Sequence, residues 1–139
     1  MRALLAIAAA LVLASCSSMP DWMPGSGAMK VSLTGAEEVP PANTSGSGSG
    51  SFRVADDGTI TGSVTTKGVQ GTMAHIHQGA KGANGPVIVP LTKNGDTYSV
   101  PEGRKLTPAQ IEALKKGQLY VNVHSDRYKG GEVRAQLQP

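Results

Sequence analysis

Hydrophobic and polar residues alternate in short runs along most of the chain from residue 29 onward. A period of two is typical of strands with one buried face, and turn residues such as glycine and asparagine separate the runs. Eight segments are predicted as strands: 29–35, 50–56, 59–68, 72–78, 85–91, 97–101, 118–125 and 132–138. Asp57-Gly58 predicts a hairpin turn between the second and third. The pattern predicts an all-β fold, as a sandwich or a Greek-key barrel.

One short helix is predicted in the segment 106–117, LTPAQIEALKKG. Thr107 suits the N-cap, Pro108 the first helical position, and Gln110 completes a capping box. Gly117 ends the helix after two lysines that suit the negative end of its dipole. A helix of about two to three turns is too short to form a layer, so we expect it to pack across one end of the sheets.

The N-terminus resembles the signal sequence of a bacterial lipoprotein. Met1 and Arg2 precede an apolar run that is too short to span a bilayer. Residues 13–16, LASC, resemble the lipobox, where cleavage leaves a diacylated cysteine as the first residue. This implies a lipid anchor on Cys16, and Ser17 favours the periplasmic side of the outer membrane. A plain secretory signal with a chance cysteine is the alternative.

Two further segments lack strand or helix periodicity. Residues 17–28, SSMPDWMPGSGA, predict a flexible tether between the membrane and the domain, which occupies residues 29–139. Within the domain, residues 43–51, NTSGSGSGS, are expected to form a mobile loop.

Composition and charge exclude several classes of function. The chain has 13 basic and 10 acidic residues, and loss of the signal peptide removes one arginine, which leaves a net charge of +2. This balance argues against a nucleic-acid partner. One Phe, one Trp and three Tyr form no stacking platform for bases or sugars. Cys16 is the only cysteine, so the domain has no internal disulfide.

All three histidines of the chain fall on predicted polar faces. Alternation puts Met73, His75 and His77 on one face of their strand and His124 on the polar face of another. Same-face neighbours lie about 6.5–7 Å apart, so an H-x-H pair can bind one ion, and His124 would complete a three-nitrogen site if the strands are neighbours. Three imidazoles suit copper or zinc, and the Met73 thioether would favour Cu(I). Three surface histidines without a metal are the alternative.

Other catalytic patterns are weak. Ser125 adjoins a histidine, but a nucleophile with its base and orienting acid cannot be placed on one face. The glycine-rich segment 79–85 opens no helix and lacks the phosphate-loop pattern. Glu37 and Glu38 are interpreted as a solvated strand end.

Three blocks of sequence resemble the CHRD domain, which was first described in chordin and occurs in bacterial secreted proteins. They are residues 33–52, 74–91 and 114–137, and the resemblance extends over about residues 31–137. It implies an immunoglobulin-like Greek-key β-sandwich, similar to that of copper-zinc superoxide dismutase. On this analogy His75 and His77 correspond to the copper-binding pair and His124 to the later copper ligand. The chain has no fourth histidine, so a dinuclear site cannot form.

Arg134 has two interpretations. By the same analogy it would stand near the histidines, on an outward face with Gln136, and attract an anion. The alternative is a solvated ion pair with Glu132 or Asp126.

Two functions remain open from the sequence. The first is an outer-membrane-anchored lipoprotein that binds a single copper ion, or zinc, through three histidines and acts in copper buffering or tolerance. Its enzymatic form would be a mononuclear copper superoxide dismutase. The second is a metal-free module of the cell envelope that binds an unidentified protein partner.

Overall fold

The computed structural model describes residues 27–139. The predicted signal peptide, Cys16 and all but the last two residues of the predicted tether lie outside the described residues. Within the described part, no helix combines the length and the apolar character needed to cross a membrane.

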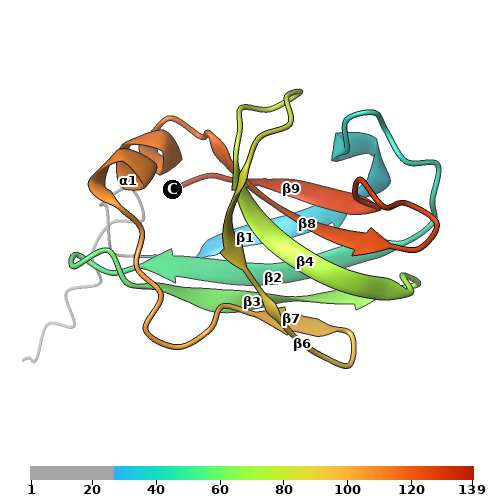
Figure 1. Cartoon of the computed structure of the whole chain (residues 1–139), viewed down its shortest axis with the longest axis horizontal. Coiled ribbons are helices and arrows are strands. Elements are labelled where there is room, and N and C mark those ends of the chain that lie inside the picture. Colours follow the sequence, from blue (N-terminus) through green and yellow to red (C-terminus); the bar gives the residue numbers. More distant parts are fainter. Residues whose placement is uncertain (1–26) are drawn as a thin grey trace, which may run out of the picture.

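The described strands pair antiparallel in one sheet. In chain order they are β1 (Met29–Thr34), β2 (Ser47–Val54), β3 (Ile60–Lys67), β4 (Gly71–Gln78), β5 (Val87–Pro90), β6 (Thr92–Asn94), β7 (Thr97–Ser99), β8 (Leu119–Ser125) and β9 (Val133–Leu137). The sheet order is β5-β4-β8-β9-β1-β2-β3-β7-β6. Because its two end strands, β5 and β6, follow one another across Leu91, the chain itself joins the edges and the sheet nearly closes (Figure 1). The prediction of an all-β fold with one short helix is confirmed.

The nearly closed sheet is flattened into two layers around one core. β1, β2 and β3 form one layer, and β4, β8 and β9 form the other. The layers meet at β9 and β1, which share a single register pair, Thr34 with Arg134. Alternate side chains fill the interior, and each fully buried aliphatic side chain contributes about 1.5–3 kcal/mol to stability. The inward residues that are at most 1% exposed include Leu33, Phe52, Ile60, Val64, Ala74, Ile76, Val89, Tyr98, Leu119, Val121, Val123, Val133 and Leu137.

The predicted helix and its cap are present. The helix α1 (Pro108–Lys115) begins after Thr107, whose hydroxyl accepts the N–H of Gln110 at 3.2 Å. The Thr107 N–H in turn donates to Oε1 of Gln110 at 2.9 Å. Ala113 and Leu114 pack into the core, so α1 covers one end of the flattened barrel (Figure 1).

The prediction of a mobile loop at residues 43–51 is wrong. β2 begins at Ser47, and its glycine–serine stretch pairs with both β1 and β3. The stretch keeps the period of two, because Gly50 lies opposite the buried Val31 while the serines alternate with the glycines. A Cβ at Gly50 would lie 2.7 Å from Cα of Val64. Glycine here permits close packing of strands and does not confer mobility.

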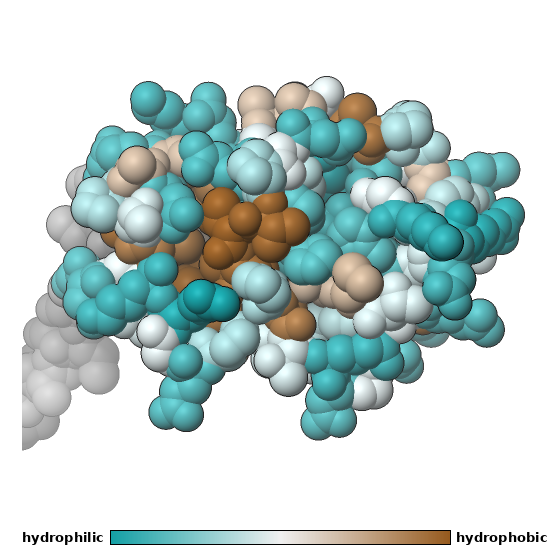
Figure 2. Space-filling view, viewed as in Figure 1, coloured by the Kyte–Doolittle hydropathy of each residue, from teal (hydrophilic) through white to brown (hydrophobic). Residues whose placement is uncertain are grey.

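One face of the molecule shows an apolar patch on an otherwise hydrophilic surface. The patch lies over β5, beside α1 (Figure 2). Val87, at the start of β5, is 45% exposed.

Candidate metal centre

The three histidines meet because β4 and β8 are hydrogen-bonded neighbours. The antiparallel register sets His75 opposite Asn122 and His124 opposite Met73, and His77 follows on the same outer face of β4. One ring nitrogen from each of the three histidines lies within 4.8 Å of the other two. In a site with metal–nitrogen bonds of about 2.0–2.1 Å, the nitrogens would lie about 3.4 Å from each other. Movements of the imidazole rings by about 1 Å would therefore suffice to bind one ion. The cluster predicted from the sequence is therefore present.

Hydrogen bonds to backbone carbonyls determine which nitrogen of two of these histidines could bind an ion. Nδ1 of His124 lies 2.8 Å from the carbonyl oxygen of Lys129, and Nδ1 of His77 lies 2.9 Å from that of Gly85. A carbonyl can only accept, so both Nδ1 atoms carry a proton and, in the neutral rings, both Nε2 atoms keep their lone pair. Metal-binding histidines are oriented by hydrogen bonds of this kind.

His75 and His124 contact each other directly. Nδ1 of His75 lies 3.1 Å from Nε2 of His124, and the ring centroids are 4.9 Å apart. Because Nε2 of His124 is the acceptor, Nδ1 of His75 donates. An ion that binds both nitrogens must replace this hydrogen bond, and the proton of His75 must move to its Nε2.

Burial disfavours the charged form of two of the histidines. Desolvation lowers the pKa of His75, and the neighbouring His124 and His77 lower it further. Desolvation also lowers the pKa of His77, although its hydrogen bonds to Gly85 and Asn122 oppose this shift. Neutral imidazole is the form that binds metal ions.

The prediction that all three histidines lie on the surface is wrong for His77. Its ring points away from the core as expected, but it is only 8% exposed. The ring of Tyr120 stacks on it, with centroids 4.7 Å apart and the planes parallel to within 1°. The hydroxyl of Tyr120 accepts the N–H of Gly85 at 3.1 Å, which ties the loop of residues 79–86 to the outer face.

Arg134 is not on a solvated face, because its exposed fraction is 1%. The guanidinium lies 3.4 Å from the ring centroid of Tyr120 and donates to the carbonyl oxygens of Ala80 at 3.1 Å and Ala83 at 2.9 Å. The expected solvated ion pair is therefore wrong, and the side chain is too buried to meet an anion from solvent. Arg134 instead fastens the loop that covers His77.

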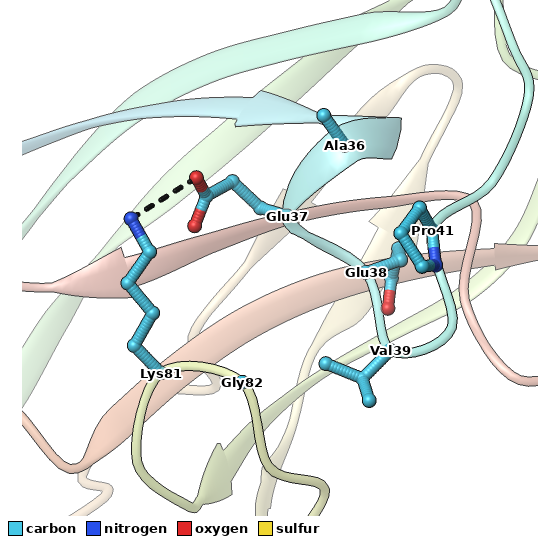
Figure 3. A pocket seen from close by; sticks show the side chains of 7 residues that line it. All are labelled: Ala36, Glu37, Glu38, Val39, Pro41, Lys81 and Gly82. Atoms are coloured by element: carbon cyan, nitrogen blue, oxygen red, sulfur yellow. Dashed lines mark ion pairs between the residues drawn. The ribbon is translucent and has the colours of Figure 1, made fainter.

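The interpretation of Glu37 and Glu38 as a solvated strand end is wrong for Glu38. They lie at the end of the 3-10 helix η1 (Gly35–Glu37), where Glu37 points toward Lys81, with 3.3 Å between Oε1 and Nζ, while Glu38 points elsewhere (Figure 3). Glu38 is 3% exposed, and burial raises its pKa to about 7 against the opposing effects of Arg134 and Asn122. Within the described part, its Oε1 has no hydrogen-bond partner.

A shallow depression of about 320 Å³ separates this segment from the loop of residues 79–86. Its lining residues are Ala36, Glu37, Glu38, Val39, Pro41, Lys81 and Gly82 (Figure 3). None of them is a histidine, so the depression is distinct from the metal centre.

Met73 lies at the exposed side of the cluster. It is opposite His124 in the ladder and is 51% exposed. Its role as a further ligand stays a prediction.

Asn122 and Tyr120 are the site residues that the sequence reasoning missed. They share the outward face of β8 with His124, and both are 2% exposed. An aromatic and an amide side chain on the same face as a metal-binding residue were a signal that this face is covered.

Fold and site together define an all-β domain with a histidine cluster on the outer face of one layer. The family model of the CHRD domain matches residues 29–137, which include all three histidines. The chain belongs to the CHRD domain family, as the three sequence blocks indicated. No curated protein and no solved structure matches the chain.

Proposed function

We propose that this CHRD domain binds a single copper ion through His75, His77 and His124 and acts in copper buffering or tolerance. The observation that carries the proposal is the cluster itself, with one nitrogen of each ring within 4.8 Å of the others. Backbone carbonyls engage Nδ1 of two of the three rings, so Nε2 is the nitrogen that these rings would offer to an ion. Three surface histidines without a metal would not need this orientation.

The ligand set favours copper. The cluster consists of imidazoles alone, which suit copper and zinc, whereas calcium and magnesium take oxygen ligands. With equal ligands, divalent copper binds more tightly than zinc. The exposed thioether of Met73, opposite His124, would add a soft ligand for Cu(I). Zinc is the alternative metal.

The proposed cellular location of the protein rests on its N-terminal sequence. We propose a lipid anchor on Cys16 that holds the domain on the periplasmic side of the outer membrane. Incorporation of labelled palmitate, lost in a Cys16→Ser variant, together with fractionation of the envelope, tests this. A protein that is released from the membranes without any label would contradict it.

Metal titration of the purified protein tests the site. We expect one equivalent of copper to bind and to raise the melting temperature, because an ion that binds only the folded state stabilises it. Each of His75→Gln, His77→Gln and His124→Gln should weaken binding by at least about tenfold, since metal affinity depends strongly on ligand number. Lys129→Ala is the matched control, because it keeps the backbone carbonyl that orients His124. Stoichiometric binding that is absent, or unaffected by all three histidine variants, would contradict the proposal and favour the metal-free interaction module.

Superoxide dismutase activity is the enzymatic form of this proposal. Three protein ligands leave a coordination position open, which such chemistry requires. The assay is worthwhile only on protein that has passed the titration, and activity that survives His124→Gln would contradict this form.

A further inference from the structure

The nitrogen of His77 that faces the cluster already has a partner. Nδ1 of His77 is bonded to the carbonyl of Gly85, so Nε2 is the nitrogen left for a metal ion. Nε2 lies 2.9 Å from Oδ1 of Asn122. In the register of β4 and β8, Asn122 stands directly opposite His75 and so lies in the middle of the outer face. An ion can therefore reach Nε2 of His77 only after the contact with Asn122 is broken.

Asn122 is itself buried beside further acceptor groups. The side chain is 2% exposed, its Nδ2 donates to the carbonyl of Gly130 at 3.4 Å, and it forms a hydrogen bond with Glu38. Glu38 is 3% exposed and also accepts a hydrogen bond from the backbone of Val39. With the amide in this orientation, Nδ2 faces these acceptors and Oδ1 faces His77. A chain of buried polar groups thus runs from Glu38 through Asn122 to the ligand nitrogen.

This row of buried polar groups has a chemical consequence for His77. With Oδ1 of Asn122 on one side and the carbonyl of Gly85 on the other, both nitrogens of the ring face acceptors. This arrangement requires either a second proton on the ring or an Asn122 amide that is turned so that Nδ2 donates to Nε2. In both arrangements Nε2 of His77 is engaged by the protein and is not available as a ligand.

We propose that Asn122, held by Glu38, is an internal competitor for the metal position on His77. This inference rests on the proposed function, because it concerns the affinity of that same site. The ion exchanges places with the amide of Asn122 at Nε2. The cost of releasing Asn122 lowers the affinity, which suits a protein that takes up and gives back an ion.

The test measures the affinity for Zn²⁺, by competition with a chelator, in native protein and in the variant Asn122→Ala. Loss of the competitor should tighten binding by about fivefold to tenfold, which corresponds to one released hydrogen bond. Asn94→Ala is the control. Asn94 is an exposed amide at the end of β6, outside the strands that carry the histidines. Its affinity should stay at the native value.

A supporting role of Asn122 predicts the opposite direction. If Asn122 only positioned His77, Asn122→Ala would bind Zn²⁺ more weakly, and this result, or an unchanged affinity, overturns the inference. If Asn122→Ala does not fold, the Zn²⁺ affinity of the double variant Asn122→Ala/Glu38→Gln distinguishes the two roles in the same way. The double variant also removes the buried carboxylate that Asn122→Ala leaves without its partner.

A measurement on the native protein needs no substitution. The side-chain amide resonances of Asn122 should shift when Zn²⁺ binds, because the amide loses its contact with His77, whereas those of Asn94 should not. Native protein that binds Zn²⁺ without any change at Asn122 overturns the inference and leaves the proposed function standing. Absence of Zn²⁺ and copper binding in native protein and all variants overturns both.

Discussion

Glu38 is a buried carboxyl whose ionisation the fold disfavours, and replacement by glutamine removes that ionisation while keeping the size of the side chain. Desolvation raises the pKa of Glu38 from 4.5 to about 7, more than Arg134 and Asn122 lower it. A group whose pKa is higher in the folded state contributes stability that is complete below pH 4.5 and is lost as the pH rises through 7. The shift corresponds to about 3 kcal/mol of unfolding free energy. Native protein should lose about 3 kcal/mol of unfolding free energy as the pH rises from 4.5 to above 7, whereas Glu38→Gln should not lose it.

The assay is urea denaturation of metal-free protein across this pH range. The difference in unfolding free energy between Glu38→Gln and native protein should move in favour of the variant by up to about 3 kcal/mol from pH 4.5 to above 7. Glu37→Gln is the matched control, because Glu37 is the neighbouring carboxylate, partly exposed and paired with Lys81. A difference in unfolding free energy between Glu38→Gln and native protein that stays constant from pH 4.5 to above 7 would contradict this prediction, because it would show that burial does not perturb the ionisation of Glu38.

Three further predictions test other parts of the structure. Gly131→Ala should lower the melting temperature and cost about 1–3 kcal/mol of unfolding free energy. The reason is that Gly131 has a φ of +130° and that a Cβ there would overlap the carboxyl of Glu38. An unchanged melting temperature would contradict this packing. Burial lowers the pKa of His75 and His77, so the stability that they contribute is complete above pH 6.5 and should be lost as the pH falls below it. Urea denaturation in the Glu38→Gln background isolates this slope, and its absence would contradict the burial of the rings. Thr107→Ala should cost about 1 kcal/mol through loss of the N-cap, and a urea midpoint equal to that of native protein would contradict the cap.

The sequence was sufficient to predict what local periodicity determines. Alternation placed Ile76 and Val121 in the core and His75 and His124 on the opposite faces, because each residue of a strand faces away from its neighbours. The capping pattern predicted α1 for a similar reason, since a helix start depends on residues within one turn. The strand β6, with three exposed residues, has no buried face to produce a pattern and was missed.

The remaining features depend on contacts between distant parts of the chain. The burial of His77 and Arg134 arises from the loop of residues 79–86, which folds back over the outer face of β4 and β8. Glu38 is buried because its segment packs near Asn122 and Arg134, far away in sequence. Polar residues on an outward face look solvated until the covering segment is known, so the sequence alone predicted exposure for all three.

Long-range ¹H–¹⁵N NMR of the imidazole rings, without and with one equivalent of Zn²⁺ or Cu⁺, shows which nitrogen of each histidine binds the ion. We expect that Nδ1 of His77 and His124 stay protonated, that the metal shifts Nε2 of both rings, and that His75 binds through Nδ1. An ion that leaves any of the three rings unshifted, or that binds His77 and His124 through Nδ1, would contradict the three-histidine site.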